Sequence, residues 1–295
     1  MTRRDESGQA LVLILLSLSV VLTLILFILS RSITDVAVSS RQEEAVRAFS
    51  AAEAGIERAL ITSADYTNEA IGNAVYTTTT IPFAFGSYDL PFPSPVSYGD
   101  TVTAWFVSHG VNDGLTCDGA PCFTGDQMKV CWGNPNTSYP DANVQPAVEV
   151  SIYYESTPGQ LSTIKIARIA LDPNTGRRDD NYFSAPDPGT CMVGEQVYDF
   201  QKTISFGNLG IPPGSRHTPN GLQFAQIRVL YNSDAQHLVG ISVNFPGGST
   251  LPSQGKQIDS SGSAGDSNRR VIYYQGWPEF PFASNAIVSP VGITK

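Results

Sequence analysis

The first sixty residues carry the clearest pattern of apolar and polar positions in this chain of 295 residues. No side chain is charged between residues 9 and 30, and a bilayer core needs about 20 apolar residues at about 1.5 Å rise per residue. Residues 31–62 contain no proline and only one glycine, Gly55, and their apolar side chains recur at near-helical spacing. The pattern predicts one long N-terminal helix, with residues 9–30 in the membrane and residues 31–62 as its amphipathic continuation.

Two simpler interpretations compete for the same segment. A cleavable secretory signal has an apolar run of about 7–15 residues followed by a small-residue cleavage site. Here the run is longer, and it continues into Arg31–Val38, which matches a cleavage site only loosely. An ordinary signal anchor fits the length, but it leaves the amphipathic stretch that follows unexplained.

The sequence after the helix favours short strands separated by turns. Residues 63–100 are rich in proline and aromatic residues, which predicts a linker or a loop packed on the body. Residues 246–268 are rich in glycine and serine, which predicts a mobile segment. Strand-like runs occur at Thr101–Ser108, Gln127–Trp132, Ala147–Glu155, Leu161–Leu171, Val197–Phe206, Leu222–Tyr231, His237–Phe245 and Arg270–Gln275.

These patterns together predict an α+β protein. A leader at residues 1–8 precedes the long transmembrane and amphipathic helix, and a β-rich head occupies residues 101–295. Many short strands without a helical period indicate a sandwich, or a single antiparallel sheet packed on the helix.

Composition and charge narrow the class of partners. Only 15% of residues are charged, against about 25% in an average soluble domain, and the net charge is −9. An acidic body repels phosphate backbones over most of its surface, so nucleic acid is not an expected partner.

Four cysteines lie in the body and none lies in the membrane segment. An even count in an extracellular domain favours two disulfides, and the sequence order suggests Cys117–Cys122 as a tight loop and Cys131–Cys191 as a long-range bridge. A zinc site is the alternative, but the C-x4-C-x8-C spacing with a distant fourth cysteine fits no usual zinc motif. We therefore expect no metal and no cofactor.

The N-terminal residues resemble those of a known family. A leader ending in Ser-Gly, the run Gln-Ala-Leu-Val-Leu-Ile-Leu-Leu, and the segment Arg-Ala-Phe-Ser-Ala-Ala-Glu-Ala-Gly-Ile-Glu (Arg47–Glu57) are similar to type IV pilin-like proteins, and most of all to minor pilins and pseudopilins. The resemblance covers about the first sixty residues, one fifth of the chain.

The resemblance implies a processing step and a set of partners. A membrane prepilin peptidase would cut between Gly8 and Gln9 on the cytoplasmic side and leave the apolar helix intact, and the new amine at Gln9 would be methylated. Other pilin subunits and the pilus assembly platform would be the partners. The expected helix-packing residues are Phe49, Ala52, Glu53 and Ile56.

Two positions depart from the major pilins of that family. The mature chain would begin with Gln9 instead of phenylalanine, and Leu13 stands where a filament-neutralising glutamate is usual. A carboxylate in lipid is expensive unless it is paired, so its absence removes both a cost and a register-setting contact. The departures favour a minor or tip subunit over a major one, and they are also compatible with a plain anchor.

Catalytic motifs are weak. Ser253-x-x-Lys256 and Gly265-Asp-Ser267 match fragments of hydrolase motifs, as short sequences do by chance, and the three histidines are scattered. The loop from Asp172 to Gly176 has oxygen donors at alternate positions, as calcium loops do, but an Asx turn explains it better. Paired tyrosines together with Trp105, Trp132 and Trp277 suggest an aromatic binding platform, although core packing is the usual role of such residues.

The sequence therefore predicts a non-enzymatic, single-pass protein of the cytoplasmic membrane. Its N-terminus lies inside, and its head is extracellular or periplasmic, as part of a cell-surface filament. As a minor pilin-like subunit, it would assemble by helix packing and present an adhesive or capping head. The alternative is a membrane-anchored surface protein that binds its target outside any filament, and a surface hydrolase has only the weak motifs in its favour.

Overall fold

The computed structural model describes residues 7–110, 114–118, 121–135, 145–231 and 233–278. Its chain divides into two compact units. The first comprises the chain up to Thr80 together with Ile258–Tyr273, and the second comprises Ile81–Gln257 and the chain from Tyr274 onward. The expected leader, residues 1–8, lies mostly outside the described residues.

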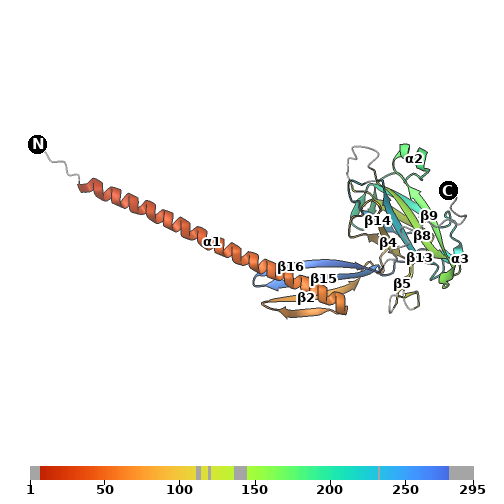
Figure 1. Cartoon of the computed structure of the whole chain (residues 1–295), viewed down its shortest axis with the longest axis horizontal. Coiled ribbons are helices and arrows are strands. Elements are labelled where there is room, and N and C mark those ends of the chain that lie inside the picture. Colours follow the sequence, from red (N-terminus) through yellow and green to blue (C-terminus); the bar gives the residue numbers. More distant parts are fainter. Residues whose placement is uncertain (1–6, 111–113, 119–120, 136–144, 232, 279–295) are drawn as a thin grey trace. The chain divides into compact units, whose positions relative to one another are not determined.

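One helix, α1 (Ser7–Thr62), dominates the first unit (Figure 1). It is continuous because no proline interrupts it and Gly55, the one glycine after its first turn, is held against a sheet. The helix ends where Ser63 adopts a left-handed conformation (φ 53°) and its N–H donates to the carbonyl of Ala59, at 2.7 Å. The predicted continuous helix is confirmed.

The C-terminal part of α1 packs on a four-stranded sheet (Figure 1). The strand order is β1-β2-β15-β16, and the strands are β1 (Tyr66–Ile71), β2 (Ala74–Pro82), β15 (Gly255–Ala264) and β16 (Ser267–Gly276). Two hairpins build it, with Gly72 (φ 56°) and Gly265 (φ 54°) at their turns.

This sheet corrects two predictions. The segment expected as a linker or packed loop, residues 63–100, contains β1, β2 and the short strand β3 (Asp89–Pro91). The segment expected to be mobile, residues 246–268, contains β15. The prediction failed because serine and glycine were taken as signs of flexibility, whereas here their small size lets the strand backbone lie against a helix.

The second unit is a β-sandwich. One sheet has the order β12-β7-β14-β3 and the other the order β4-β13-β8-β9, and neighbouring strands in both sheets pair antiparallel. Two-stranded ribbons β5-β6 and β10-β11 and short helices complete it. The bounds are β4 (Thr101–Trp105), β5 (Ser108–His109), β6 (Leu115–Thr116), β7 (Gln127–Trp132), β8 (Ala147–Glu155), the 3-10 helix Leu161–Thr163, β9 (Ile164–Leu171), α2 (Thr175–Asn181), β10 (Cys191–Val193), β11 (Gln196–Tyr198), β12 (Phe200–Ser205), α3 (Pro213–Arg216), β13 (Leu222–Leu230) and β14 (Val239–Ser242).

The main core lies between the two sheets. Met128, Val130 and Trp132 of β7 are fully buried and belong to the same cluster as Val150 and Ile152 of β8. Inward-facing residues alternate along these strands, as a sandwich requires. The predicted α+β class, with an N-terminal helix and a β-rich head, is confirmed, and β7 and β8 begin and end at the predicted residues.

Candidate functional site: the N-terminal helix and its sheet

The N-terminal part of α1 is an apolar surface without a protein partner among the described residues. Side chains from Leu11 to Val38 are exposed, and the helix is long and apolar enough to cross a membrane. The hydroxyls of Ser17, Ser19 and Thr23 donate to carbonyls three or four residues earlier, at 2.8–3.0 Å. In lipid such groups must be satisfied within the helix, so this segment meets that requirement by itself.

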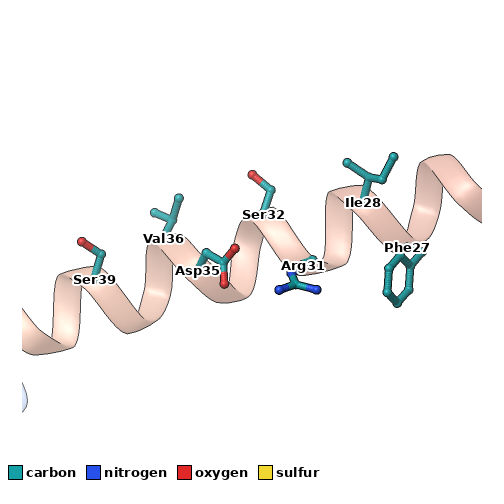
Figure 2. A pocket seen from close by; sticks show the side chains of 7 residues that line it. All are labelled: Phe27, Ile28, Arg31, Ser32, Asp35, Val36 and Ser39. Atoms are coloured by element: carbon teal, nitrogen blue, oxygen red, sulfur yellow. The ribbon is translucent and has the colours of Figure 1, made fainter.

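The first charged residues mark where the apolar stretch ends. Figure 2 shows an open groove along α1 between Phe27 and Ser39, and its lining includes Arg31 and Asp35. Its walls come from one helix only, so it is a stretch of helix surface and not an enclosed cavity. Arg31 is thus the first charged residue after the charge-free run.

Small residues let the C-terminal part of α1 approach its sheet closely. Ala48, Ala51, Ala52 and Ala59 are at most 1% exposed, in a face directed at the sheet. A Cβ added at Gly262 of β15 would lie 2.0 Å from the carbonyl oxygen of Ala48.

Gly55 faces the same sheet from the helix. A Cβ added there would lie 2.4 Å from Ser260 Oγ and 2.6 Å from Thr78 Oγ1. The Ala-Ala-x-Ala-Gly segment therefore packs against the chain's own sheet.

Two polar contacts fix the sheet at either end of this face. Nearer the N-terminus of α1, the N–H of Asp266, in the β15–β16 turn, donates to Glu44 at 3.3 Å. Nearer the C-terminus of α1, the Arg58 guanidinium donates to Tyr76 Oη at 2.9 Å and to Glu69 at 3.1 Å. The same guanidinium lies 4.2 Å from the centroid of the Tyr66 ring. These contacts hold both hairpins to the helix.

The structure divides the four expected helix-packing residues into two pairs. Ala52 and Ile56 are buried against the chain's own sheet. Phe49, at 44% exposure, and Glu53 lie on the exposed side. A sequence pattern alone does not separate these sides, because both follow helical spacing.

The expected processing site lies at the beginning of the helix. Gly8 and Gln9 fall in the first turn of α1, which begins at Ser7. Four N–H groups at a helix start have no partner within the helix, and this turn is where the expected cleavage would create a new amine.

The four cysteines pair as the sequence order suggested. Cys117 bonds to Cys122 and Cys131 to Cys191, so no free cysteine is left. The second bridge joins β7 of the sandwich to the ribbon strand β10. Two disulfides are typical of a head outside the reducing cytoplasm.

The aromatic residues named in the sequence do not form one platform. Trp132 lies in the sandwich core, and Tyr154 packs against the same core. Trp105, Tyr153 and Phe224 form a smaller cluster on the outer face of β4-β13-β8, with Trp277 packed against it. Trp105, Tyr153 and Phe224 are only 3–7% exposed, so the cluster is mainly a second core.

Ring contacts continue this cluster toward the surface. His109 contacts Trp105 at 4.4 Å between centroids and stacks on Trp277 at 4.6 Å. His109 is one of the three scattered histidines, and no sequence motif around it indicates this contact. Trp277 and His109 are both half-buried, so they form the accessible end of this aromatic cluster.

The weak catalytic motifs have structural roles. The Ser253 hydroxyl donates to the Gly255 carbonyl, and the Ser253 carbonyl accepts from Trp277 Nε1 at 2.8 Å. Ser267 begins β16, and His237 is buried, which lowers its pKa. Within the described part of the chain, no three histidine, cysteine or acidic side chains gather as metal ligands.

Comparison with known proteins adds no relative. No protein-family model, curated protein or solved structure matches this chain.

Proposed function

We propose that this chain is a minor pilin-like subunit of a type IV pilus or a related secretion filament. The observation that carries the proposal is the division of α1 into two segments. The lower, N-terminal segment is apolar and exposed, and the upper, C-terminal segment is covered by the sheet on one side only. The lower segment has the length and internal hydrogen bonding of a membrane span. The upper segment keeps its opposite side, with Phe49 and Glu53, open to a partner.

The surroundings of the helix support the same proposal. A head with two disulfides suits an exterior location, and the apolar part of α1 suits an anchor with its N-terminus inside. The head, a β-sandwich with an aromatic cluster on its outer face, would cap or decorate the filament and contact other surfaces.

N-terminal processing tests the proposal. The protein is purified from membranes of a host with and without a prepilin peptidase, and the intact mass and N-terminal peptide are measured. We expect a mature chain that begins at methylated Gln9 only when the peptidase is present. A Gly8→Leu variant should stay unprocessed in both hosts.

The second candidate function is a membrane-anchored surface protein outside any filament. Leu13, in place of the glutamate typical of major pilins, is the observation in its favour. This function predicts an intact Met1 in both hosts, or a cut near Ser39 by an ordinary signal peptidase. Either result would reject the filament proposal.

A further inference from the structure

One stripe of α1 changes its partner along the helix. Residues spaced three and four apart lie on one helix face, and Thr34, Ala37, Arg41, Glu44 and Ala48 follow that spacing. The chain's own sheet contacts this stripe from Glu44 upward. Below Glu44 the same stripe is exposed at Thr34, Ala37 and Arg41.

A second exposed stripe lies on another side of the helix. Val46 is 65% exposed and Phe49 is 44% exposed, and Glu53 is exposed as well. Neither Arg41 nor Glu53 has an ion pair among the residues that the structure describes.

The two stripes have the same internal spacing. Thr34, Ala37 and Arg41 follow the pattern i, i+3, i+7, and the second stripe repeats it twelve residues later. We propose that two copies pack in parallel in the assembled filament. The exposed part of the first stripe in one copy (Thr34, Ala37, Arg41) then lies on the second stripe of the other copy (Val46, Phe49, Glu53). The pairs are Thr34 with Val46, Ala37 with Phe49, and Arg41 with Glu53.

The side chains at this offset are complementary in size and charge. The small Ala37 leaves room for the Phe49 ring, and Thr34 and Val46 are both β-branched. Arg41 and Glu53 then supply each other with a counter-charge. The contact is head-to-tail, because the two copies use different surfaces, and so each copy keeps one stripe open to a further pilin subunit.

Charge also opposes other offsets. At twelve residues, Arg31 lies level with Glu43, and Asp35 level with Arg47, so every charge match along the exposed helix is attractive. With no offset, each charge lies level with its own copy, and at sixteen residues the repulsion of Arg31 and Arg47 opposes the attraction of Arg41 and Glu57. Like charges at close range disfavour both arrangements.

The offset belongs to the assembled state. Twelve residues correspond to about 18 Å along a helix, more than half of a bilayer core of about 30 Å. Two copies in one membrane cannot be displaced by that distance without exposing an apolar segment to water. The inference therefore rests on the proposed function, in which subunits leave the bilayer to enter a filament.

Cysteine cross-linking in the full chain tests the contact. Both substitutions, Ala37→Cys and Phe49→Cys, are placed in one chain, expressed with the peptidase and the assembly platform, and the sheared surface fraction is oxidised. The four native cysteines are already paired, so they do not interfere. The two new thiols cannot bridge within one chain, because they are about 18 Å apart on a straight helix.

The expected result is a cross-linked dimer in the surface fraction. Each single variant should stay monomeric, and so should the control pair Ala37→Cys with Glu57→Cys, which has a different offset. The pair Thr34→Cys with Val46→Cys should give the same dimer, which covers the case in which the first pair fails to assemble. Dimers from Phe49→Cys alone, or from the control pair, would overturn the offset while leaving the filament intact.

Charge reversal gives an independent readout. Arg41→Glu or Glu53→Arg alone should reduce the surface fraction by about two- to fivefold, and the double reversal should restore it. If the double variant is no better than the single ones, the pair does not form. If the wild-type chain never reaches the surface fraction, the proposed function fails, and the inference with it.

Discussion

At the scale of single residues, Asp172 shows how a sequence resembling an ion-binding loop is used internally. Its carboxylate is fully buried and accepts from Arg177 Nε at 2.9 Å, from the Arg177 terminal nitrogen at 2.7 Å, and from Asn181 at 2.8 Å. The N–H of Asn174 donates to it as well, as in an Asx turn, and Asn174 caps α2. The expected Asx turn is confirmed.

These contacts determine how the carboxylate titrates. Burial alone would raise the pKa of Asp172, but the hydrogen bonds from Arg177, Asn174 and Asn181 together outweigh burial and lower it. A lowered pKa contributes stability that is present above the ordinary carboxyl value, about 4, and is lost as pH falls through the native value.

We predict that Asp172→Asn destabilises the protein by about 3 kcal/mol at neutral pH, because it leaves the Arg177 guanidinium, 13% exposed, without its counter-charge. The free energy of unfolding of the detergent-solubilised chain, measured with guanidinium chloride as denaturant, gives the difference between variant and wild type. The variant should also lose less stability than the wild type below about pH 4. Asp180→Asn, on the exposed side of α2, is the matched control. An equal effect of the two changes would contradict this account.

At the scale of elements, the main contact is that of α1 with β15. The helix contributes alanines and Gly55, and the strand contributes Gly262, so backbones meet where large side chains would normally separate them. Close approach of this kind depends on every residue in the contact staying small.

We predict that Gly262→Ala destabilises the helix–sheet contact by about 2 kcal/mol, because the added methyl group meets the Ala48 carbonyl and neither backbone can move independently. Thermal unfolding followed by circular dichroism is the measurement. Gly276→Ala provides the control, since a Cβ there meets no atom within 4 Å. A variant at Gly262 as stable as the control would show that the two elements are farther apart than described.

Three of the strands that the sequence missed, β1, β2 and β15, belong to this same sheet. β2 is rich in threonine and β15 in serine and glycine, and the inner face of the sheet contacts small helix residues instead of a large apolar core. Alternation of large apolar residues identified β7, β8 and β13, because those strands face the sandwich core. Where a helix supplies the opposite wall, that signal is weak.

At the scale of the whole molecule, α1 has two roles in one continuous element. Its first part is the candidate membrane span, and its last part completes the core of the first unit. In the sheet of that unit, β2, which ends at Pro82, pairs with β15, which begins at Gly255, so its formation requires closure of a loop of about 170 residues.

We predict that residues 31–295 form a soluble monomer, whereas residues 63–295 associate. Both chains lack the candidate membrane span, residues 9–30. The second chain also lacks the helix that covers Ala74, Tyr76, Ile258 and Ala264, so these side chains would be exposed and could associate. Size-exclusion chromatography with light scattering compares the two chains. A monomeric 63–295 chain with unchanged thermal stability would show that the sheet does not depend on the helix.

The sequence by itself determined the long helix, its charge-free segment and most strands of the sandwich. These features follow from local periodicity, charge and residue order, which a single chain displays directly. Only the tertiary structure decided which side of α1 is covered, that the glycine- and serine-rich segment is a strand, and that Trp105 and Trp132 lie in different clusters. The physical reason is that burial depends on residues far apart in the chain, and helical spacing is the same for a covered and an exposed face.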